Sequence, residues 1–437
     1  MGGGKKRVKR EAGDGVDRIS ALPAHLKECI LECVSVKDAM KTSVLSSNWR
    51  YCWTGMRKFN LIDVERDVDV LRRAVDRILL LHSGSIREFK LGIPVTRFGQ
   101  NIYLSDFFHV LSEKGIQDIE IDGSFNRVLL PSSLFHCRDL KTLRLLDCCI
   151  LSRPPRVVGF SNLLSLEIIF CTVPSLVLGS LISQFPVLEK LWLSYTHTLN
   201  NNQPLVINAH NLRIVFFEDE LLGSIIFENV PRLTYVKFSV FETFEAELEM
   251  PGSWPSICSL SGIMVLEFDI FSLGPMIGEC PSCLPTTLEN LKTLTLTSVN
   301  ACVEDDVRFM FCLIRSSPGL QDLTVLFDNL NTTWMPETDH TGEAAAQKLL
   351  ETEEREHRKL SNLLTVIFKD IKGLCHEMLL VKIMLSRCPY LKLFKISPHS
   401  RNTTKDVRKR IRRELKEFPN KDKLIYCKKL SLTSKVF

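Results

Sequence analysis

A short pattern of alternating apolar residues recurs along almost the whole chain. Each copy reads apolar, two other residues, apolar, one other residue, apolar, as in LKTLRL and LEKLWL. The copies begin at Ile86, Ile116, Leu140, Leu163, Leu188, Leu212, Leu233, Ile263, Leu291, Leu320, Leu363 and Leu391. Most start 21 to 30 residues after the previous one, and the step of 43 residues from Leu320 to Leu363 is the exception. This near-regular order favours a genuine repeat over chance matches in a leucine-rich sequence.

The pattern predicts an α/β fold. The last three positions of each copy form a short strand whose alternate side chains point to opposite sides, apolar inward and variable outward. One copy cannot bury its apolar side alone, but stacked neighbours share a continuous core. The period is that of leucine-rich repeats or slightly longer. We therefore expect a curved solenoid with one parallel sheet and a helical or irregular outer side, with Cys148 and Cys171 at buried structural positions of their repeats.

The long step between the copies at Leu320 and Leu363 contains an insertion. Its sequence GEAAAQKLLETEEREHRKL follows Pro336 and consists largely of strong helix formers. We expect an exposed helix or a flexible excursion. Charges of both signs alternate along it, which favours a solvated face, and we assign it no chemistry.

A small helical module precedes the repeats, between Asp17 and Trp53. Three short helices are expected there, and Trp49 and Trp53 share one face of the third. The expected starts are Leu22-Pro23 for the first helix, Asp38 for the second, and Ser46 or Ser47 for the third. The first carries an apolar face with Leu26, Ile30, Cys33 and Val34. So small a module cannot bury this surface alone, so it either binds a partner or caps the first repeat, and the residues leave both open.

The same segment resembles a known domain. DRIS-x-LP, followed by D-A-x-x-TSVLS-x-x-WR-x-x-W, closely resembles an F-box, in the version found in plant proteins of the F-box, leucine-rich-repeat and FBD family. RILLLHSGSIREFKL, from Arg77 to Leu91, resembles that family's linker into its first repeat. Asn48 departs from the family on the exposed side, where Lys or Arg is common.

The C-terminal part resembles the FBD segment of that family. The resemblance lies in LLTVIFKDIKGLCHEMLLVKIMLSRCPYLKLFKI, although Cys388-Pro389-Tyr390 and the later FPNKDKLIY depart from the usual residues. The expected organisation is a basic disordered tail (1–15), an F-box (16–55), a helical linker (56–85), leucine-rich repeats (86–335), a charged helical insertion (336–360), an FBD-like segment continuing the solenoid (361–400) and a basic tail or helix (401–437).

The resemblance implies a function. In that family the F-box docks on a Skp-type adaptor, which joins a cullin and a RING protein to form a ubiquitin ligase, and the repeats hold a protein substrate. The protein itself is non-catalytic. The resemblance implies an adaptor-binding set at or directly behind the docking surface, consisting of Leu22, Pro23, Ile30, Leu31, Val44, Leu45, Trp49 and Trp53. The two tryptophans would make the module rigid and able to bind.

Substrate is expected on the concave side of the solenoid. The outward positions of successive strands give a column that reads Arg144, Glu167, Trp192, Phe216 and Lys237, and continues with Glu267, Thr295, Thr324, Ile367 and Lys395. Aromatic residues surrounded by charge are typical anchors of protein interfaces, so we expect Trp192 and Phe216 to contact substrate. Alternatively, a loop or the insertion folds over this pair and buries it.

Other classes of function lack residues to support them. There is no P-loop, GxSxG, HExxH or dinucleotide glycine motif, so we expect no enzymatic activity and no cofactor. Cys280-Pro-Ser-Cys283 has no second pair for a zinc site. Two alternatives share the interaction role and stay open: a scaffold acting outside a ligase, and a receptor that binds substrate through a small molecule.

Charge and hydropathy suggest where the protein acts. The net charge is only +5, and basic residues gather at the two ends in KKRVKR and RKRIRRELK. The repeats carry no sustained positive stripe, so we expect no nucleic-acid partner. No secretory signal or membrane span is recognisable, so we expect no membrane partner and a location in the nucleus, the cytoplasm or both. The N-terminal cluster leaves nuclear import open.

Overall fold

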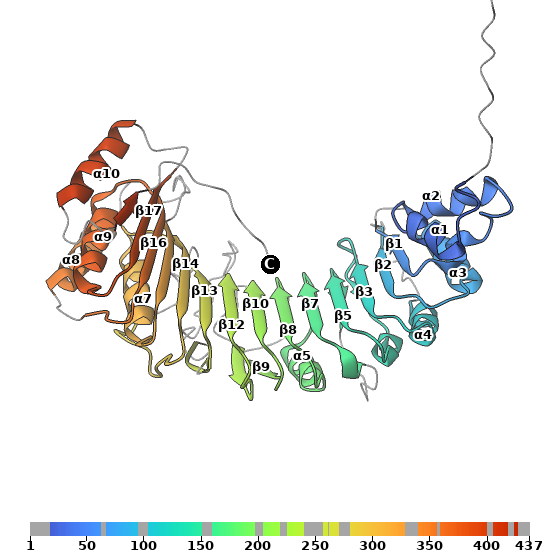
Figure 1. The fold of residues 1–437 in the computed structure, drawn as a ribbon. Helices are drawn as coiled ribbons and strands as arrows, with labels where there is room; N and C mark the ends of the chain where they lie inside the picture. The colour runs from blue at the N-terminus through green and yellow to red at the C-terminus, as the bar shows by residue number, and fades with distance from the viewer. Residues whose placement is uncertain are drawn as a thin grey trace, which may run out of the picture.

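The chain forms an open arc, with its first helices at one end and its last helices at the other (Figure 1). The computed structural model describes residues 18–62, 67–94, 104–150, 160–196, 204–218, 225–239, 257–260, 262–270, 280–327, 340–355, 359–399, 405–417 and 424–426. The N-terminal basic cluster lies outside these residues.

One parallel sheet runs along the whole arc (Figure 1). Its 14 strands follow one another in chain order. They are β1 (Lys58–Leu61), β2 (Glu88–Gly92), β3 (Asp118–Asp122), β5 (Thr142–Leu146), β7 (Ser165–Ile169), β8 (Lys190–Ser194), β10 (Ile214–Glu218), β12 (Tyr235–Ser239), β13 (Val265–Asp269), β14 (Thr293–Val299), β15 (Asp322–Phe327), β16 (Thr365–Ile371), β17 (Leu393–Pro398) and β18 (Leu424–Tyr426). Every predicted copy supplies one strand, which confirms the solenoid. The pattern did not predict β1 and β18 at the two ends.

Alternation along each strand builds the core. In β5, Leu143 and Leu145 are buried. Thr142, Arg144 and Leu146, which alternate with them along the strand, are half-buried on the other side. The same alternation recurs in most strands of the sheet. Because neighbouring strands pair in the same phase, the buried residues form one continuous core from the N-terminal module to the last helix.

Helices and short sheets close the convex side of the arc (Figure 1). The helices along this side are α3 (Val68–Leu81), α4 (Ser105–Glu113), α5 (Ser175–Ile182), α7 (Glu304–Arg315), α8 (His340–Arg355) and α9 (Cys375–Arg387), with 3-10 turns η3 (Ser132–His136) and η4 (Phe160–Asn162), whereas α10 (Lys405–Glu417) lies at the C-terminal end. Two small parallel pairs join β4 (Val128–Leu129) to β6 (Cys148–Cys149) and β9 (Leu205–Asn208) to β11 (Ile225–Glu228). Cys148 and Cys171 are fully buried, and the Cys148 backbone N–H lies 3.4 Å from the Cys171 sulfur.

The N-terminal module differs from the prediction in two places. It contains α1 (Ala24–Leu31) and α2 (Val36–Lys41), which the 3-10 turn η1 (Thr42–Val44) follows directly. Turns at 47–51 and the 3-10 turn η2 (Cys52–Gly55) replace the expected third helix. The intervening Ser-rich stretch favours turns because short polar side chains compete for backbone hydrogen bonds. The second prediction was wrong by three residues: Ser35 caps α2, accepting a hydrogen bond from the Asp38 N–H, and Asp38 lies inside the first turn.

The module is joined rigidly to the first repeats. His82 Nε2 donates to the Met56 carbonyl at 2.8 Å, and the Lys114 ammonium donates to the His82 carbonyl at 2.9 Å. The imidazole also packs edge-on against Phe59 of β1, with ring centroids 5.5 Å apart. A second link is the Glu32 side chain, which accepts a hydrogen bond from the Arg57 N–H at 2.8 Å. The module therefore caps the first repeat, which is one of the two alternatives that the sequence left open.

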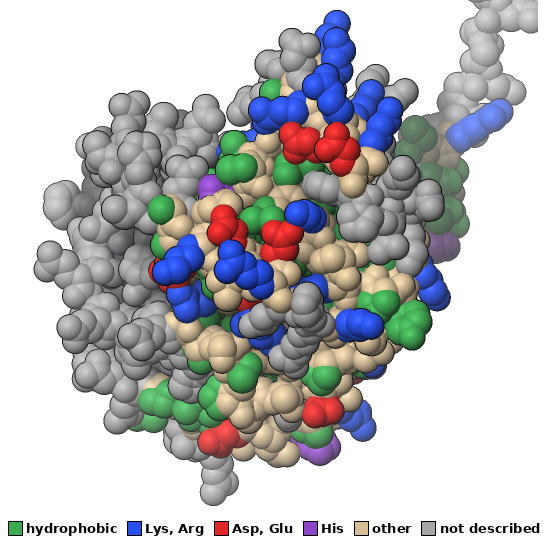
Figure 2. Space-filling view, turned by 90° about the vertical axis from the view of Figure 1, so that its left-hand side faces the viewer, with side chains coloured by type: hydrophobic (Ala, Val, Ile, Leu, Met, Phe, Trp, Pro, Cys, Tyr) green, Lys and Arg blue, Asp and Glu red, His purple; other side chains and the backbone are tan. Residues whose placement is uncertain are grey.

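At the opposite end, α10 closes the solenoid as a basic helix. Ile411 and Leu415 are buried in the core, and Gly373 (φ +78°) lies so close that a Cβ there would be 2.8 Å from Ile411. Figure 2 looks onto this end, and its upper part shows the Lys and Arg side chains of α10 facing solvent. The exposed basic residues are Lys405, Lys409, Arg410, Arg412, Arg413 and Lys416. The C-terminal basic run is thus one charged helix with a single apolar side.

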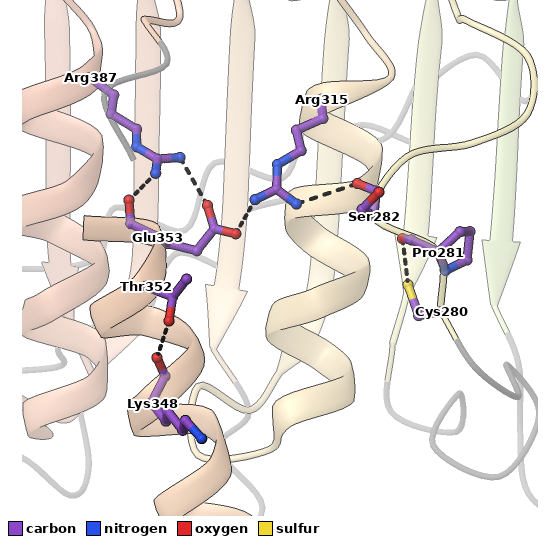
Figure 3. Close-up of polar contacts among 8 residues, drawn as sticks. All are labelled: Cys280, Pro281, Ser282, Arg315, Lys348, Thr352, Glu353 and Arg387. Carbon is purple, nitrogen blue, oxygen red and sulfur yellow. Dashed lines mark hydrogen bonds and ion pairs between the residues drawn. The ribbon is translucent and has the colours of Figure 1, made fainter. Parts of the chain in front are cut away.

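The insertion helix α8 is half buried, so the expectation of a solvated excursion was wrong for one of its faces. Ala346, Leu350 and Glu353 are buried against α7 and α9. Figure 3 shows the Glu353 carboxylate between two guanidinium groups, one from α7 and one from α9. Arg387 Nη1 lies 2.9 Å from Glu353 Oε2, and Arg315 contacts the other oxygen. Glu353, whose charge the sequence analysis placed in solvent, instead connects α8 to α7 and α9.

Replacing Glu353 by Ala should destabilise the C-terminal end of the solenoid. Arg387 would lose its carboxylate partner while 6% exposed, and Arg315 while 15% exposed. Breaking a buried ion pair by removing one partner costs about 3–5 kcal/mol. Urea unfolding, with hydrogen exchange of α7 to α9, measures the loss. Glu351→Ala on the exposed side of the same helix is the control and should change stability by about 0.5 kcal/mol or less. Equal effects of the two variants would contradict the buried role of Glu353.

The junction at His82 should loosen as pH falls. Burial lowers the pKa of His82 below its usual 6.5, although its hydrogen bond to the Met56 carbonyl opposes this shift. Because the pKa is lower in the folded state, the stability contribution is fully present above the unfolded pKa of about 6.5. It is lost as pH falls from there through the lower folded-state pKa. His82→Gln keeps a donor for the Met56 carbonyl but cannot be charged.

Hydrogen exchange of α3 and β1, compared between native chain and variant at matched pH, tests this. Below about pH 6.5 the native chain should lose protection faster than His82→Gln, and the two should agree at higher pH. Identical pH profiles would exclude His82 as the titrating group.

Candidate protein-interaction surfaces

An apolar surface covers the exposed side of the N-terminal module. Large apolar side chains that normally avoid water are exposed there, with Val44 at 86% and Leu45 and Tyr51 at 69% each. Its full set is Ile19, Leu26, Ile30, Val34, Val44, Leu45 and Tyr51, and we call it the module surface. This number of exposed apolar side chains on so small a helical domain makes the module surface a candidate protein-interaction site.

The predicted adaptor-binding residues divide between this surface and the core beneath it. Ile30, Val44 and Leu45 belong to the module surface, Pro23 is exposed and Leu22 is half-buried. Leu31, Trp49 and Trp53 are buried. The predicted site set omitted Ile19, Leu26, Val34 and Tyr51. For Leu26 and Val34 the signal was available, since with Ile30 they are spaced four residues apart, although α1 ends at Leu31 and Val34 lies in the turn after it.

The two tryptophans build the core that supports the module surface. Trp49 Nε1 donates to the Ser20 hydroxyl at 2.9 Å, and the Lys27 ammonium lies 5.7 Å from the centre of the Trp49 ring. Trp53 is 4% exposed and lies in η2, directly before the junction with β1. The large indole rings therefore give two short helices and two turns a fixed arrangement that they could not reach alone.

The second candidate surface is the concave side of the sheet. Consecutive strands align the predicted middle residues directly opposite one another, so Arg144 faces Glu167, Glu167 faces Trp192, Trp192 faces Phe216 and Phe216 faces Lys237. The column continues in register through Glu267, Thr295, Thr324, Ile367 and Lys395. The predicted register of this column is therefore confirmed. At the other end it extends to Glu120, Lys90 and Asn60.

Alternating charges connect the first strands across this surface. The ion pairs are Lys58–Glu88 at 3.7 Å, Lys90–Glu88 at 3.3 Å, Lys90–Glu120 at 3.1 Å, Arg144–Glu120 at 3.5 Å, Arg144–Glu167 at 3.5 Å and Lys190–Glu167 at 3.2 Å. We call this set the charge ladder. The hydrogen bond between Lys90 and Glu120 raises the pKa of Lys90, so this ammonium stays charged at neutral pH. Sequence reasoning named only Arg144 and Glu167 of the ladder as site residues.

An aromatic cluster adjoins the ladder at the middle of the arc. The rings of Trp192 and Phe216 lie 5.4 Å apart, and Tyr235 lies 5.4 Å beyond Phe216. The Lys190 ammonium is 5.7 Å from both the Trp192 and Phe216 ring centres. The rings are half-buried, and among the described residues the buried Trp192 Nε1 has no hydrogen-bond partner. Tyr235, which the prediction did not include, completes this aromatic cluster.

Neither a metal centre nor a membrane helix is found in the part of the chain that the structure describes. No group of three or more His, Cys, Asp or Glu side chains there is arranged to hold a metal ion. Cys280 is buried whereas Cys283 is exposed. No described helix is long and apolar enough to cross a bilayer.

Comparison with known proteins identifies both parts of the chain. Residues 19–61 match the family model of the F-box domain, and residues 104–325 match the model described as FBD-associated F-box protein At5g56370, LRR repeats. The chain is 30% identical over 424 residues to F-box/FBD/LRR-repeat protein At1g13570 of Arabidopsis thaliana, covering 93% of this chain and 97% of that protein. It is 29% identical over 325 residues to FBD-associated F-box protein At5g56370 of the same plant, covering 70% and 74%.

Proposed function

The chain belongs to the family of F-box proteins with FBD and leucine-rich-repeat segments, and from this premise we propose that it is the substrate-recognition subunit of a Skp–cullin–F-box ubiquitin ligase. F-box proteins with leucine-rich repeats are typically non-catalytic adaptors. The observation that carries the proposal is an exposed apolar module surface on an F-box that is packed rigidly against a solenoid.

The module surface is proposed to dock on a Skp-type adaptor and, through it, on cullin and RING subunits. Interfaces derive most of their affinity from a few large, well-packed anchors surrounded by polar side chains. Ile30, Val44 and Leu45 supply such anchors, while Trp49 and Trp53 hold them in place from below. Docking would cover apolar side chains that are otherwise exposed to water, which favours association.

The concave face is proposed to capture the protein substrate. Arg144, Glu167, Trp192, Phe216 and Lys237 lie in one aligned column on consecutive strands, where a single partner can reach all of them. The module and this column share one continuous core, so a captured substrate is held at a fixed position relative to the ligase. Action in the nucleus, the cytoplasm or both is part of the proposal.

Two other roles use the same face. A plain scaffold would bind partners and the adaptor without recruiting a cullin. A small-molecule receptor would need a ligand in the concave face before substrate binds. Cullin recruitment separates the first role from the proposed function, and binding of substrate by the purified chain without added ligand separates the second.

Charging the module surface should abolish adaptor binding without unfolding the chain. The double variant Ile30→Glu with Val44→Glu places two carboxylates in the proposed interface, and anchors of this kind are each worth about 2 kcal/mol or more. We expect affinity for a purified Skp-type adaptor to fall about a hundredfold or more in a pull-down or titration.

The matched control is Leu129→Glu with Leu176→Glu, which charges two exposed apolar residues on the solenoid. It should bind the adaptor like the native chain. Trp53→Ala should also lose binding, but with loss of the module's fold by circular dichroism. Unchanged binding by the Ile30 and Val44 variant would refute the docking surface.

Removing the aromatic pair should abolish substrate capture. Trp192→Ala with Phe216→Ala deletes the two largest side chains of the concave column while the inward leucines stay in place. Proteins whose ubiquitination depends on the native chain should accumulate in cells that carry the double variant, as measured by quantitative proteomics. Adaptor binding should persist. A variant that folds and still directs the same ubiquitination would exclude the pair as substrate contacts.

A further inference from the structure

The charge ladder consists of four cations and three carboxylates, and the cations lie nearer to solvent. Its cations are the more exposed members, with side-chain exposures of 51% for Lys58, 33% for Lys90, 40% for Arg144 and 37% for Lys190. Its carboxylates lie lower, at 27% for Glu88, 16% for Glu120 and 14% for Glu167. An approaching partner therefore meets ammonium and guanidinium groups before it meets carboxylates.

The covered carboxylates are already in use. Glu120 lies between Lys90 and Arg144, and Glu167 lies between Arg144 and Lys190. A basic partner would have to displace these pairs to reach them, whereas an acidic partner can add to the outer side. The cations have donors to spare, since an ammonium has three N–H groups and a guanidinium five.

A hollow of 320 Å³ lies over this part of the ladder. Lys90 and Arg144 are the cations that line it, together with Thr142 and Ile119 of the neighbouring strands. The other lining residues are Glu88, Asp118, Glu120 and Glu167. Each of these carboxylates has a basic partner, and for Asp118 this partner is Arg87 at 4.0 Å. Two cations and four carboxylates line the hollow itself. Counted with their partners Lys58, Arg87 and Lys190, five cations surround the four carboxylates, and in each ion pair the cation is the more exposed side chain.

The spacing of the cations fits an extended peptide. Lys90, Arg144 and Lys190 lie on β2, β5 and β8, each two strands from the next, which corresponds to about 9.6 Å. An extended chain with three residues per turn, as in polyproline II, advances about 3.1 Å per residue, so every third side chain returns to the same side after about 9.3 Å. The aromatic cluster of Trp192, Phe216 and Tyr235 begins at the strand that carries Lys190. Three carboxylates and a neighbouring apolar side chain could therefore be read together.

We propose that the concave face recognises an acidic, extended polypeptide segment. Its carboxylates, at about every third residue, meet Lys90, Arg144 and Lys190, and a bulky apolar side chain next to them packs on Trp192, Phe216 and Tyr235. The inference rests on the proposed function and specifies the chemical class of substrate. The same geometry gives selectivity, since a basic segment would meet like charge at the outermost groups.

The test uses the full chain and two fluorescein-labelled peptides in a fluorescence anisotropy titration. One peptide carries Glu at every third position followed by Leu, and the other carries Lys in place of each Glu. We expect the Glu peptide alone to bind, with affinity that weakens as salt is raised. Lys90→Gln with Arg144→Gln should weaken it about tenfold or more, because charged hydrogen-bond partners bind a carboxylate more strongly than neutral ones do.

The charge-matched control is Arg73→Gln with Arg232→Gln, two exposed arginines outside the ladder, which should leave peptide affinity unchanged. Adaptor binding is measured on the same preparations. If the adaptor binds but the Glu peptide does not, or if the Lys peptide binds better, the inference is wrong while the proposed function stands. If the ladder variant binds the Glu peptide like the native chain, the inference is equally overturned. Failure of the native chain to bind the adaptor would instead count against the proposed function.

Discussion

In-register stacking of parallel strands over one shared core is the constraint on which the rest of the structure depends. No repeat can bury Leu143 and Leu145, or their equivalents, without its neighbours on both sides. Because side chains alternate along a strand, a slip of one residue would turn a leucine pair outward and a charged residue inward. The inward leucines therefore fix the positions of the outward residues, and the concave column is as well defined as the core beneath it.

Stacking also creates two ends that must be closed, and the chain closes them differently. At the C-terminal end, helices α7 to α10 complete the core, with Glu353 shared between two arginines of neighbouring helices. At the N-terminal end, the F-box is joined to the solenoid where Phe59 and Met56 contact His82 at the end of α3, but it leaves apolar residues exposed on its outer side. Of the two alternatives that the sequence left open, the structure shows the cap, and the exposed apolar side of the same module is where we propose that a partner binds.

Much of this arrangement could be predicted because it depends on local periodicity. The repeat pattern predicted twelve strands and the register that brings Trp192 beside Phe216, since both follow from spacing alone. Features that depend on contacts between distant segments could not be predicted. Glu353 reads as a solvent-exposed charge until α8 is placed between α7 and α9. The turn-rich stretch before Trp49 carries helical spacing, yet its serines favour turns. The outward position of the ladder cations depends on side-chain packing that no spacing encodes.

The central claim is that one rigid chain joins a ligase to a substrate, and assembly of the complete ligase tests it most directly. The purified chain would be mixed with a Skp-type adaptor, a cullin and a RING subunit, and the products weighed by mass photometry. The account predicts a single complex that contains one copy of each subunit. When the chain is omitted, nothing should join the adaptor to the substrate peptide. A chain that binds the adaptor but excludes the cullin would contradict the ligase role and favour a scaffold, and a chain that enters no complex would contradict the account as a whole.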